Sequence, residues 1–324
     1  MTISEYSAGA FIYRYERGRS LFLILKKRNR EYDLPKGHIE KGESETEAAR
    51  REILEETGIN AEFDGFFSES TKYFFYRNGG RIAKGVKFFL AEVSSSRVRI
   101  SHEHLSYDWC SYETAVKRLK YKDIVQLMPR VIEYIRRKKA MQEVNSEYSR
   151  LPASTKEWSL SPRFVPGEGR LDARLMLIGQ APGANEDRLL RPFVGRSGRL
   201  LDSVLERSRI RRDDVYITSV VQFFPPRNRM PTPKEVGLCK SFLFRQIGLI
   251  KPKYAVLLGN LASESVLGVG EVKRNHGREI LKDGIRYFIT LHPSAALRFS
   301  ANHALMLNDF KRLAGKIGKT PRDR

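Results

Sequence analysis

The chain has 324 residues, of which 41% are hydrophobic, and a formal net charge of +21. This length favours two domains, and the positive charge favours polyanionic partners such as nucleic acid. The two cysteines, Cys110 and Cys239, exclude a disulfide framework and a four-cysteine metal site. No apolar run approaches the length of a membrane span, so no membrane partner is expected. The first eleven residues lack a basic segment followed by a long apolar one, which predicts a cytoplasmic protein.

The positive charge is concentrated in the second half of the chain. Residues 161–324 hold 30 Lys and Arg against 15 Asp and Glu, which is +15 of the total +21. The second half is therefore the better candidate for binding DNA. A basic protein whose charges are simply solvated remains the alternative.

In the first half, two strands around a charged turn are expected over 8–27. A helix is expected over 44–57, because Ser44 and Glu47 form a capping box and Gly58 is a typical helix stop. Further strands and helices follow from the periodicity of apolar residues. The expected strands are 72–76, 85–93 and 97–100, and the expected helices are 111–119 and 123–138.

From residue 173 onward, apolar runs alternate with helical patterns, which is typical of a parallel sheet covered by helices. A polar stretch rich in proline and serine precedes this region and is interpreted as a linker. The predicted domains are 1–138 and 161–324, joined by the linker 139–160. The expected strands are 175–178, 215–222, 254–258 and 286–291, and the expected helices are 197–208, 233–250 and 260–267.

The helix after Ser44 carries three carboxylates on one face. Glu52, Glu55 and Glu56 are spaced i, i+3 and i+4. Packed carboxylates repel one another unless a cation lies among them, and hard oxygen ligands suit Mg²⁺ or Mn²⁺. An ordinary acidic, solvent-facing helix is the alternative, but it does not account for Gly37, Glu43, Arg51, Gly58 and Ile59 at fixed offsets.

The stretch from Gly37 to Ile59 resembles the Nudix box. This resemblance implies a pyrophosphohydrolase with a mixed-sheet α/β/α sandwich fold. It implies that Glu52, Glu55, Glu56 and the Gly37 carbonyl bind metal ions, which polarise a phosphate and activate water. It also implies that Arg51 orients the carboxylates and that Glu43 supports the loop or the base.

Three flanking segments are similar to asymmetrical diadenosine tetraphosphate hydrolases: 34–40, LPKGHIE; 101–104, SHEH; and 107–109, YDW. By position, the resemblance implies that Lys36 contacts phosphate, that Tyr73 stacks on an adenine and that Glu103 joins the metal or water site. Core packing of Tyr73 and Trp109 is an equal alternative. The substrate could instead be dUTP or an oxidised deoxynucleotide.

A second ordered set of motifs lies in the C-terminal half. GQAPGANED at 179–187 is followed by RPFVG at 191–195, PPRNR at 225–229 and LHPSAALR at 291–298. In this order the motifs resemble the uracil-DNA glycosylase superfamily, family 4 in particular, over residues 165–315. The resemblance implies an α/β/α domain with a central parallel sheet that takes up a base flipped out of single-stranded or damaged DNA.

The chemistry of base excision suits these residue types. Gly179 and Ala181 would offer backbone N–H groups near the sugar, with Gln180 beside the reacting bond, and Phe193 would stack on the base, which is worth about 1–3 kcal/mol. His292 would stabilise the negative charge that develops on the departing base. DNA contacts are expected from a further set of residues: Arg227, Arg229, Ser294, Leu297 and Arg298.

Three departures from family 4 affect the expected activity. Of the four cysteines that hold an iron–sulfur cluster in that family, only Cys239 is present, and Phe223 stands at the third position, so no cluster is expected. Gln180 replaces an acidic residue, and Ser219 stands where a base-reading Asn is usual. A hydroxyl cannot reproduce the paired hydrogen bonds of an amide, which predicts weakened or altered uracil selectivity. A non-catalytic module that binds damaged DNA is therefore the alternative for this domain.

Overall fold

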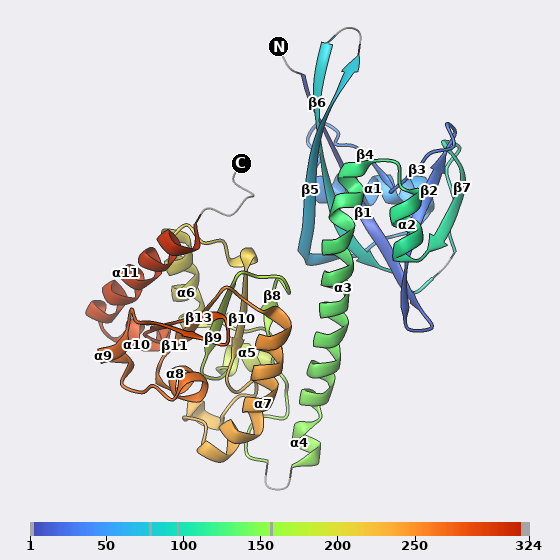
Figure 1. Cartoon of the computed structure of the whole chain (residues 1–324). Coiled ribbons are helices and arrows are strands. Elements are labelled where there is room, and N and C mark those ends of the chain that lie inside the picture. The colour runs from blue at the N-terminus through green and yellow to red at the C-terminus, as the bar shows by residue number, and fades with distance from the viewer. Residues whose placement is uncertain (1–2, 78–79, 96, 156–157, 319–324) are drawn as a thin grey trace. The chain divides into compact units, whose positions relative to one another are not determined.

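We describe the protein from a computed structural model in which residues 3–77, 80–95, 97–155 and 158–318 are described (Figure 1). The chain divides into two compact units, 1–135 and 136–324. Both are mixed α/β structures, each built on one sheet. None of the described helices is long and apolar enough to cross a membrane.

The N-terminal unit is built on a mixed seven-stranded sheet. The predicted hairpin is confirmed as β1 (Ile3–Glu16) and β2 (Arg19–Lys27), and β1 also runs parallel to β6 (Gly80–Glu92). The sheet order is β3-β2-β1-β6-β5, with β4 paired to β1 and β7 paired to β2. The bounds of the remaining strands are Tyr32–Asp33 for β3, Lys36–His38 for β4, Phe63–Arg77 for β5 and His104–Cys110 for β7.

The helix predicted over 44–57 is confirmed as α1 (Glu45–Thr57). The Ser44 hydroxyl accepts a hydrogen bond from the Glu47 backbone, and the Glu47 carboxylate accepts one from the Ser44 backbone. Gly58 ends the helix at φ 67°, a left-handed conformation that glycine adopts without strain. Ala48, Ala49 and Ile53 are buried against the sheet, which fixes α1 upon it.

The strand predicted at 97–100 is wrong. This segment forms no ladder, and instead its Arg99 N–H donates to the Thr57 carbonyl at the C-terminal end of α1. The apolar residues Val98 and Ile100 still pack on the core, which explains the misleading pattern. The predicted helix 111–119 is present as α2 (Tyr112–Arg118).

The helix predicted at 123–138 is longer than expected. It forms α3 (Lys122–Ser149), so residues 139–149 of the predicted linker are helical, and α4 (Leu151–Ser154) follows. The linker prediction rests on the polar composition of this stretch. One face of the helix is nevertheless apolar and buried, with Met141, Val144 and Tyr148 at helical spacing, and its burial stabilises the helix.

The C-terminal unit has a six-stranded sheet in the order β12-β13-β11-β9-β10-β8. Its four central strands are parallel, as predicted: β9 (Leu175–Gly179), β10 (Val215–Ser219), β11 (Tyr254–Leu258) and β13 (Ile285–Thr290). The edge strands β8 (Glu168–Gly169) and β12 (Glu279–Lys282) are antiparallel to their neighbours, so the sheet is mixed.

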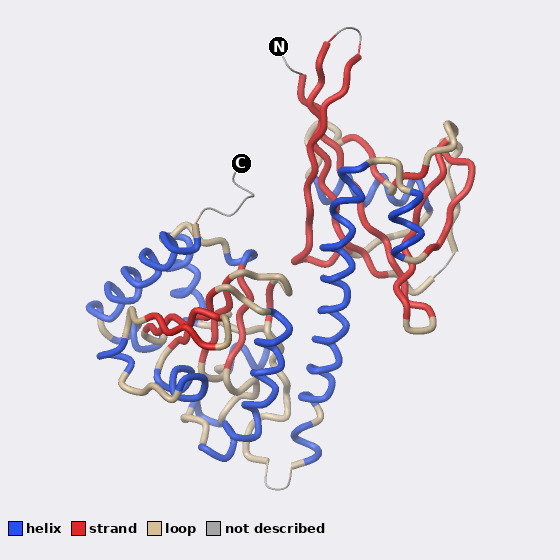
Figure 2. The backbone as a smooth tube through the Cα atoms, viewed as in Figure 1, coloured by secondary structure: helices blue, strands red, loops and turns tan. Residues whose placement is uncertain are grey.

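Helices cover this second sheet, as Figure 2 shows. The core joins the strands to α6 (Arg196–Arg207) and α11 (Ser300–Ile317) through Leu201, Val204, Met306 and Phe310. Four other helices lie between strands in the sequence: α5 (Ala184–Leu189), α7 (Pro233–Ile250), α8 (Asn260–Leu267) and α9 (Val272–Asn275). The helix α10 (Pro293–Arg298) follows the last strand, and short 3-10 turns lie at Arg212–Asp214 and Pro226–Asn228.

Candidate active sites

The loop before α1 approaches this helix very closely at Gly37. A Cβ atom at this position would lie 1.9 Å from the Glu52 carboxyl carbon, so only glycine permits the approach. One helical turn further on, a Glu56 carboxylate oxygen accepts a hydrogen bond of 3.0 Å from the Lys36 N–H. The carboxylates of Glu52 and Glu56 therefore converge on the same short stretch of backbone.

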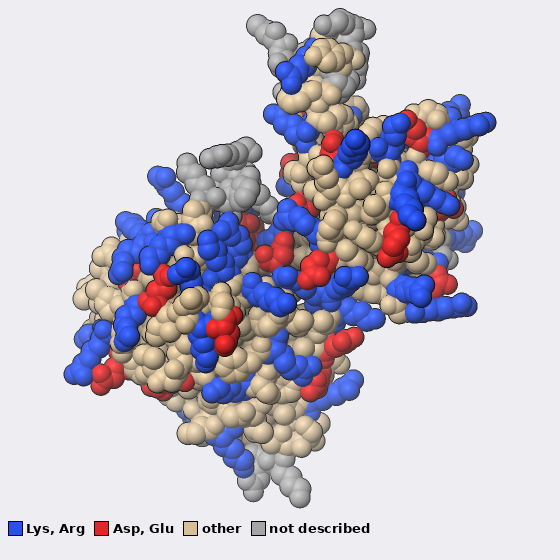
Figure 3. Space-filling view, viewed as in Figure 1, with Lys and Arg blue, Asp and Glu red and all other residues tan. Residues whose placement is uncertain are grey.

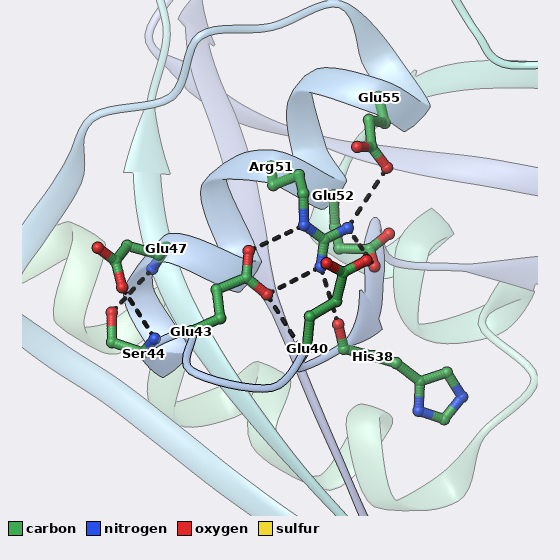
Figure 4. Close-up of polar contacts among 8 residues, drawn as sticks. All are labelled: His38, Glu40, Glu43, Ser44, Glu47, Arg51, Glu52 and Glu55. Atoms are coloured by element: carbon green, nitrogen blue, oxygen red, sulfur yellow. Dashed lines mark hydrogen bonds and ion pairs between the residues drawn. The ribbon is translucent and has the colours of Figure 1, made fainter.

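Arg51 forms hydrogen bonds to several residues of the stretch 37–59, as expected for a residue that orients the carboxylates (Figure 4). Its guanidinium donates to both Glu43 oxygens, at 2.8 and 3.0 Å, and to Glu52 at 2.9 Å. It also donates to the His38 carbonyl at 2.9 Å, and this bond holds the loop against the helix. Glu55 lies farther out, exposed and 3.4 Å from the same guanidinium.

Glu56 has the most perturbed carboxylate of this site. Burial raises its pKa to about 8, and the nearby Glu52 charge adds to the rise against the opposing effects of the Lys36 backbone and ammonium groups. The His104 Nε2 lies 3.7 Å from a Glu56 oxygen, and burial lowers the pKa of this histidine. A buried carboxylate beside a second one favours a cation as its partner.

These residues fit a divalent cation in part. Glu52, Glu56 and the Gly37 backbone offer oxygen ligands of the kind that Mg²⁺ and Mn²⁺ prefer. Among the described residues, however, no three Asp, Glu, His or Cys side chains converge in a metal-binding arrangement. Glu55, the third expected ligand, is turned toward Arg51.

Beside Glu56 lies a cluster of lysines and tyrosines that the sequence analysis found only in part. The Lys36 ammonium forms an ion pair with buried Asp33, which Lys27 contacts at 2.5 Å. Burial acts to raise the pKa of Asp33, but the two ammonium groups hold it below its usual value. Both ammonium groups lie 5.6 Å from the Tyr121 ring centroid. Lys36, the expected phosphate contact, thus belongs to a larger cluster that contains a second ammonium group.

Tyr73 faces this cluster, whereas the remaining aromatic and acidic predictions lie elsewhere. The hydroxyl of Tyr73 interacts electrostatically with Tyr121, Asp33 and Lys27, and burial is the main cause that raises its pKa to about 12. Trp109 packs on the core, with Arg14 at 5.2 Å from its ring, which agrees with the packing alternative. Glu103 is exposed at a turn, and the neighbouring His104 is the residue that reaches Glu56.

The second site is a cavity of about 810 Å³ in the C-terminal unit. It opens where β9 and β10 end, which is the usual place for a ligand site in a parallel sheet. Its wall includes predicted residues from distant parts of the sequence: Gln180, Ala181, Phe193, Ser219, Arg229, His292, Ser294, Leu297 and Arg298.

Two glycines place the Phe193 ring in this cavity. A Cβ on Gly179 would lie 2.5 Å from the ring, and one on Gly198 would lie 1.9 Å from the Phe193 carbonyl oxygen. Phe193 itself has a positive φ of 53°, so its backbone is held in a strained conformation. The ring lies 6.0 Å from the His292 ring, which places both on one cavity. Ser219 is buried at the end of β10, close to Gly179.

The hydrogen bonds of His292 define its tautomer. Its Nδ1 accepts a bond of 3.1 Å from the Ser294 N–H and lies 2.7 Å from the Ser294 hydroxyl. Burial lowers the pKa of His292 to about 4, so the ring is neutral at physiological pH. With Nδ1 as the acceptor, the proton resides on Nε2, and His292 can donate a hydrogen bond.

Glu186 is a residue of this site whose role the sequence analysis missed. One carboxylate oxygen accepts bonds from the Val194 and Gly195 N–H groups, at 2.9 and 2.6 Å, and the other accepts from Gly183 at 3.0 Å. Glu186 therefore ties the loop after β9 to the loop that carries Phe193. A carboxylate three residues after the helix cap was the available signal.

The expected DNA contacts differ in their availability. Leu297 and Arg298 are exposed at the cavity rim, as expected for a wedge and a phosphate contact. Arg229 instead donates to both Glu235 oxygens, at 2.8 and 2.6 Å. Ser294 is committed to His292, and Arg227 is exposed on the turn before α7. Lys and Arg side chains cover much of the surface in Figure 3.

The surroundings of Cys239 do not fit an iron–sulfur cluster. Five aromatic rings fill this region: Tyr148, Trp158, Phe164, Phe223 and Phe242. Tyr148 stacks on Phe242 at 4.3 Å and meets Phe223 edge-on at 5.2 Å, while Trp158 meets Phe223 at 5.0 Å. Burial raises the pKa of Cys239 to about 11, so it is a thiol and a poor ligand.

Comparisons with known proteins match a different family to each half of the chain. The NUDIX domain family matches residues 5–132, and the uracil DNA glycosylase superfamily matches residues 166–314. A type-4 uracil-DNA glycosylase of Pyrobaculum aerophilum is 41% identical over 143 residues, which cover 41% of this chain and 73% of that protein. An asymmetrical bis(5'-nucleosyl)-tetraphosphatase of Caenorhabditis elegans is 35% identical over 125 residues, or 38% of this chain and 90% of that protein.

Among solved structures, a C. elegans Ap4A hydrolase binary complex matches 40% of this chain and 97% of its own, with 31% identity and a TM-score of 0.37. The identities and coverage of the two curated relatives show the families of both halves. This chain is therefore an enzyme that joins a domain of the Nudix family to a domain of the uracil-DNA glycosylase superfamily.

Proposed function

We propose that the N-terminal domain hydrolyses dinucleoside polyphosphates, with diadenosine tetraphosphate giving ATP and AMP. The observation that carries this is the pair of ammonium groups, on Lys27 and Lys36, beside Tyr73, Tyr121 and Glu56. A polyphosphate flanked by two bases requires cations and aromatic faces close together, and this cluster offers both.

In this proposal each residue of the box has a distinct role. Glu52, Glu55, Glu56 and the Gly37 carbonyl would hold Mg²⁺ or Mn²⁺, which supplies charge for the phosphate and activates water. Arg51 and Glu43 hold the carboxylates and the loop in place. Lys36 would contact phosphate and Tyr73 would stack on a base.

The test is the release of ATP and AMP from diadenosine tetraphosphate in the presence of Mg²⁺. Parallel reactions with dUTP and an oxidised deoxynucleoside triphosphate test the alternative that the domain hydrolyses one of these nucleotides instead. Turnover of the dinucleotide at a clearly higher kcat/KM than either triphosphate is expected. Preference for a triphosphate would contradict the substrate assignment and leave the hydrolase family unaffected.

We propose that the C-terminal domain excises uracil or another deaminated base from DNA. The observation that carries this is the meeting of Phe193, Gln180 and a neutral His292 in one cavity. Phe193 would stack on the flipped base, and the backbone of Gly179 and Ala181 with Gln180 would face the sugar. His292 would donate from Nε2 to the base oxygen as the C–N bond breaks and negative charge develops.

Around the cavity, Leu297 would wedge into the vacated stack, and the exposed Arg298 and Arg227 would contact the DNA backbone. Ser219 would meet the edge of the base with one hydroxyl, so selectivity among deaminated bases should be broad. Incubation with single-stranded and mismatched DNA that holds uracil, hypoxanthine or xanthine, followed by detection of abasic sites, tests the activity. DNA binding without any abasic site would favour the non-catalytic module.

The pH dependence of base excision follows from the low pKa of His292. The ring is neutral above about pH 4 in the folded protein, so we expect no loss of single-turnover rate from this group between pH 8 and pH 5.5. The unfolded pKa is about 6.5, so stability contributed by this group is present above pH 6.5 and is lost as pH falls toward 4. A rate that declines with an apparent pKa near 6.5, absent in a His292→Gln variant, would contradict the assignment.

The aromatic surroundings of Cys239 lead to a prediction about composition. Protein purified under anaerobic conditions should be colourless and contain no stoichiometric iron or acid-labile sulfide. Cys239→Ser should leave the metal content and the excision rate unchanged, because one buried thiol cannot hold a cluster. Recovery of about four irons per chain would overturn this prediction.

A further inference from the structure

The N-terminal domain carries a second aromatic surface at the far end of its longest hairpin. Strands β5 and β6 extend together with β1 as a ribbon, best followed in Figure 2. In the register, Tyr76 pairs with Arg81, and Gly85 pairs with both Lys72 and Tyr6. Because paired residues and residues two apart share a side of a sheet, five side chains form one ribbon face: Tyr6, Lys72, Phe74, Tyr76 and Arg81.

The aromatic rings of the ribbon face are open to solvent. The exposed fractions are 62% for Tyr6, 48% for Phe74 and 76% for Tyr76. Gly85 leaves room for Tyr6, whose ring lies 3.2 Å from the position that a Cβ there would occupy. Three large exposed aromatic rings on one strip of a sheet contribute nothing to the core, which favours a binding role.

Cations accompany these rings. The Arg81 guanidinium lies 3.9 Å from the centroid of Phe74, and the Lys72 ammonium lies 5.9 Å from it. The sequence from 70 to 88 contains five Lys and Arg and no Asp or Glu. Next to the atoms drawn in grey, the ribbon shows blue and tan atoms on the side seen in Figure 3. The ribbon face is therefore suited to an anionic partner with flat apolar groups.

The ribbon face is separate from the proposed nucleotide site. Tyr73 alternates with Lys72 and Phe74 along β5, so it lies on the opposite side of the sheet. There it interacts with Tyr121, Asp33 and Lys27. The proposed hydrolysis therefore does not use Phe74, Tyr76 or Arg81.

We propose that the ribbon face binds a single strand of nucleic acid. The rings of Tyr6, Phe74 and Tyr76 stack on unpaired bases, while Arg81 and Lys72 neutralise the phosphates between them. A segment with five cationic residues and no acidic one complements the uniform negative charge of a phosphate backbone, which favours nucleic acid over a protein partner. Stacking tolerates any base, so this surface binds without sequence preference. The proposal is independent of which reaction either domain catalyses.

The experiment uses the full chain. Because the C-terminal domain is expected to bind DNA as well, the measurement must show which residues contact the oligonucleotide. Single-stranded oligonucleotides of thymidine or uridine that carry 5-iodouracil are photocrosslinked, and the modified peptides are mapped by mass spectrometry. We expect crosslinks at Phe74 and Tyr76. The paired variant Phe74→Ala and Tyr76→Ala should lose them and bind the oligonucleotide at least roughly tenfold more weakly.

Phe244→Ala is the matched control, since Phe244 is another exposed ring with a lysine, Lys240, 5.7 Å above it. It should leave crosslinks and affinity unchanged, and both the paired variant and the control should keep the parent rate of nucleotide hydrolysis. Crosslinks confined to the C-terminal domain, with equal affinity for parent and paired variant, would overturn the proposal. So would a paired variant that changes only the sedimentation of the protein, since this would assign the ribbon face to self-association.

Discussion

Glu56→Gln should abolish nucleotide hydrolysis, with a fall in kcat on the order of 10²–10⁴. Glu56 is the most buried of the three glutamates that share one face of α1, and its carboxylate interacts electrostatically with Glu52. An amide preserves its shape and its bond from the Lys36 N–H but removes the negative charge that a divalent cation needs. The measurement is steady-state release of ATP and AMP with saturating Mg²⁺.

The stability of the metal-free Glu56→Gln variant should not fall with its activity. The folded pKa of Glu56 is raised to about 8, so ionisation of this buried carboxyl destabilises the metal-free protein. Stability is greatest below the unfolded pKa, about 4.3, and declines as pH rises toward 8. Without metal at pH 8.5, Glu56→Gln should therefore melt no lower than the parent. Glu62→Gln, an exposed glutamate beyond the helix, should change neither quantity. A Glu56→Gln variant with the parent kcat would contradict the assignment.

Local patterns predicted the helix α1 and the parallel strands well. The capping box at Ser44 and the stop at Gly58 act between residues close in sequence, and the structure confirms both. The runs at 175–178 and 254–258 are buried strands because their residues are apolar on both faces. The segment 97–100 failed because its apolar residues pack on the core without a partner strand. The spacing of apolar residues indicates which side chains are buried, but it does not show whether a segment pairs with another strand.

Most features of the two sites that could not be predicted from the sequence are contacts between residues far apart in the chain. Nothing near Lys36 in the sequence shows that Lys27 competes for the same carboxylate of Asp33. Arg229 appears free on a loop, but its guanidinium is paired with Glu235. By contrast, the tautomer of His292 depends on Ser294, only two residues away, so the motif itself contained that information.

The same bond leads to the second large effect. His292→Ala should lower the single-turnover rate of base excision about 10²–10³-fold, as removal of one donor to a developing anion does. The neutral ring of His292 carries its proton on Nε2 and is already oriented by Ser294, so it can donate to the developing charge without rearrangement. The alanine variant lacks this donor, and its rate therefore falls. His292→Gln retains an N–H donor on a side chain of similar reach and should recover part of the rate.

DNA affinity distinguishes this effect from loss of the fold or of binding. His292→Ala should bind uracil-containing single-stranded DNA within about threefold of the parent, because stacking on Phe193 and phosphate contacts supply most of the affinity. His303→Gln changes a half-buried histidine of α11 outside the cavity wall and should retain the parent rate. If the alanine variant excises the base as fast as the parent, His292 does not stabilise the leaving base. Gln180, on the opposite loop of the cavity, then becomes the residue to test.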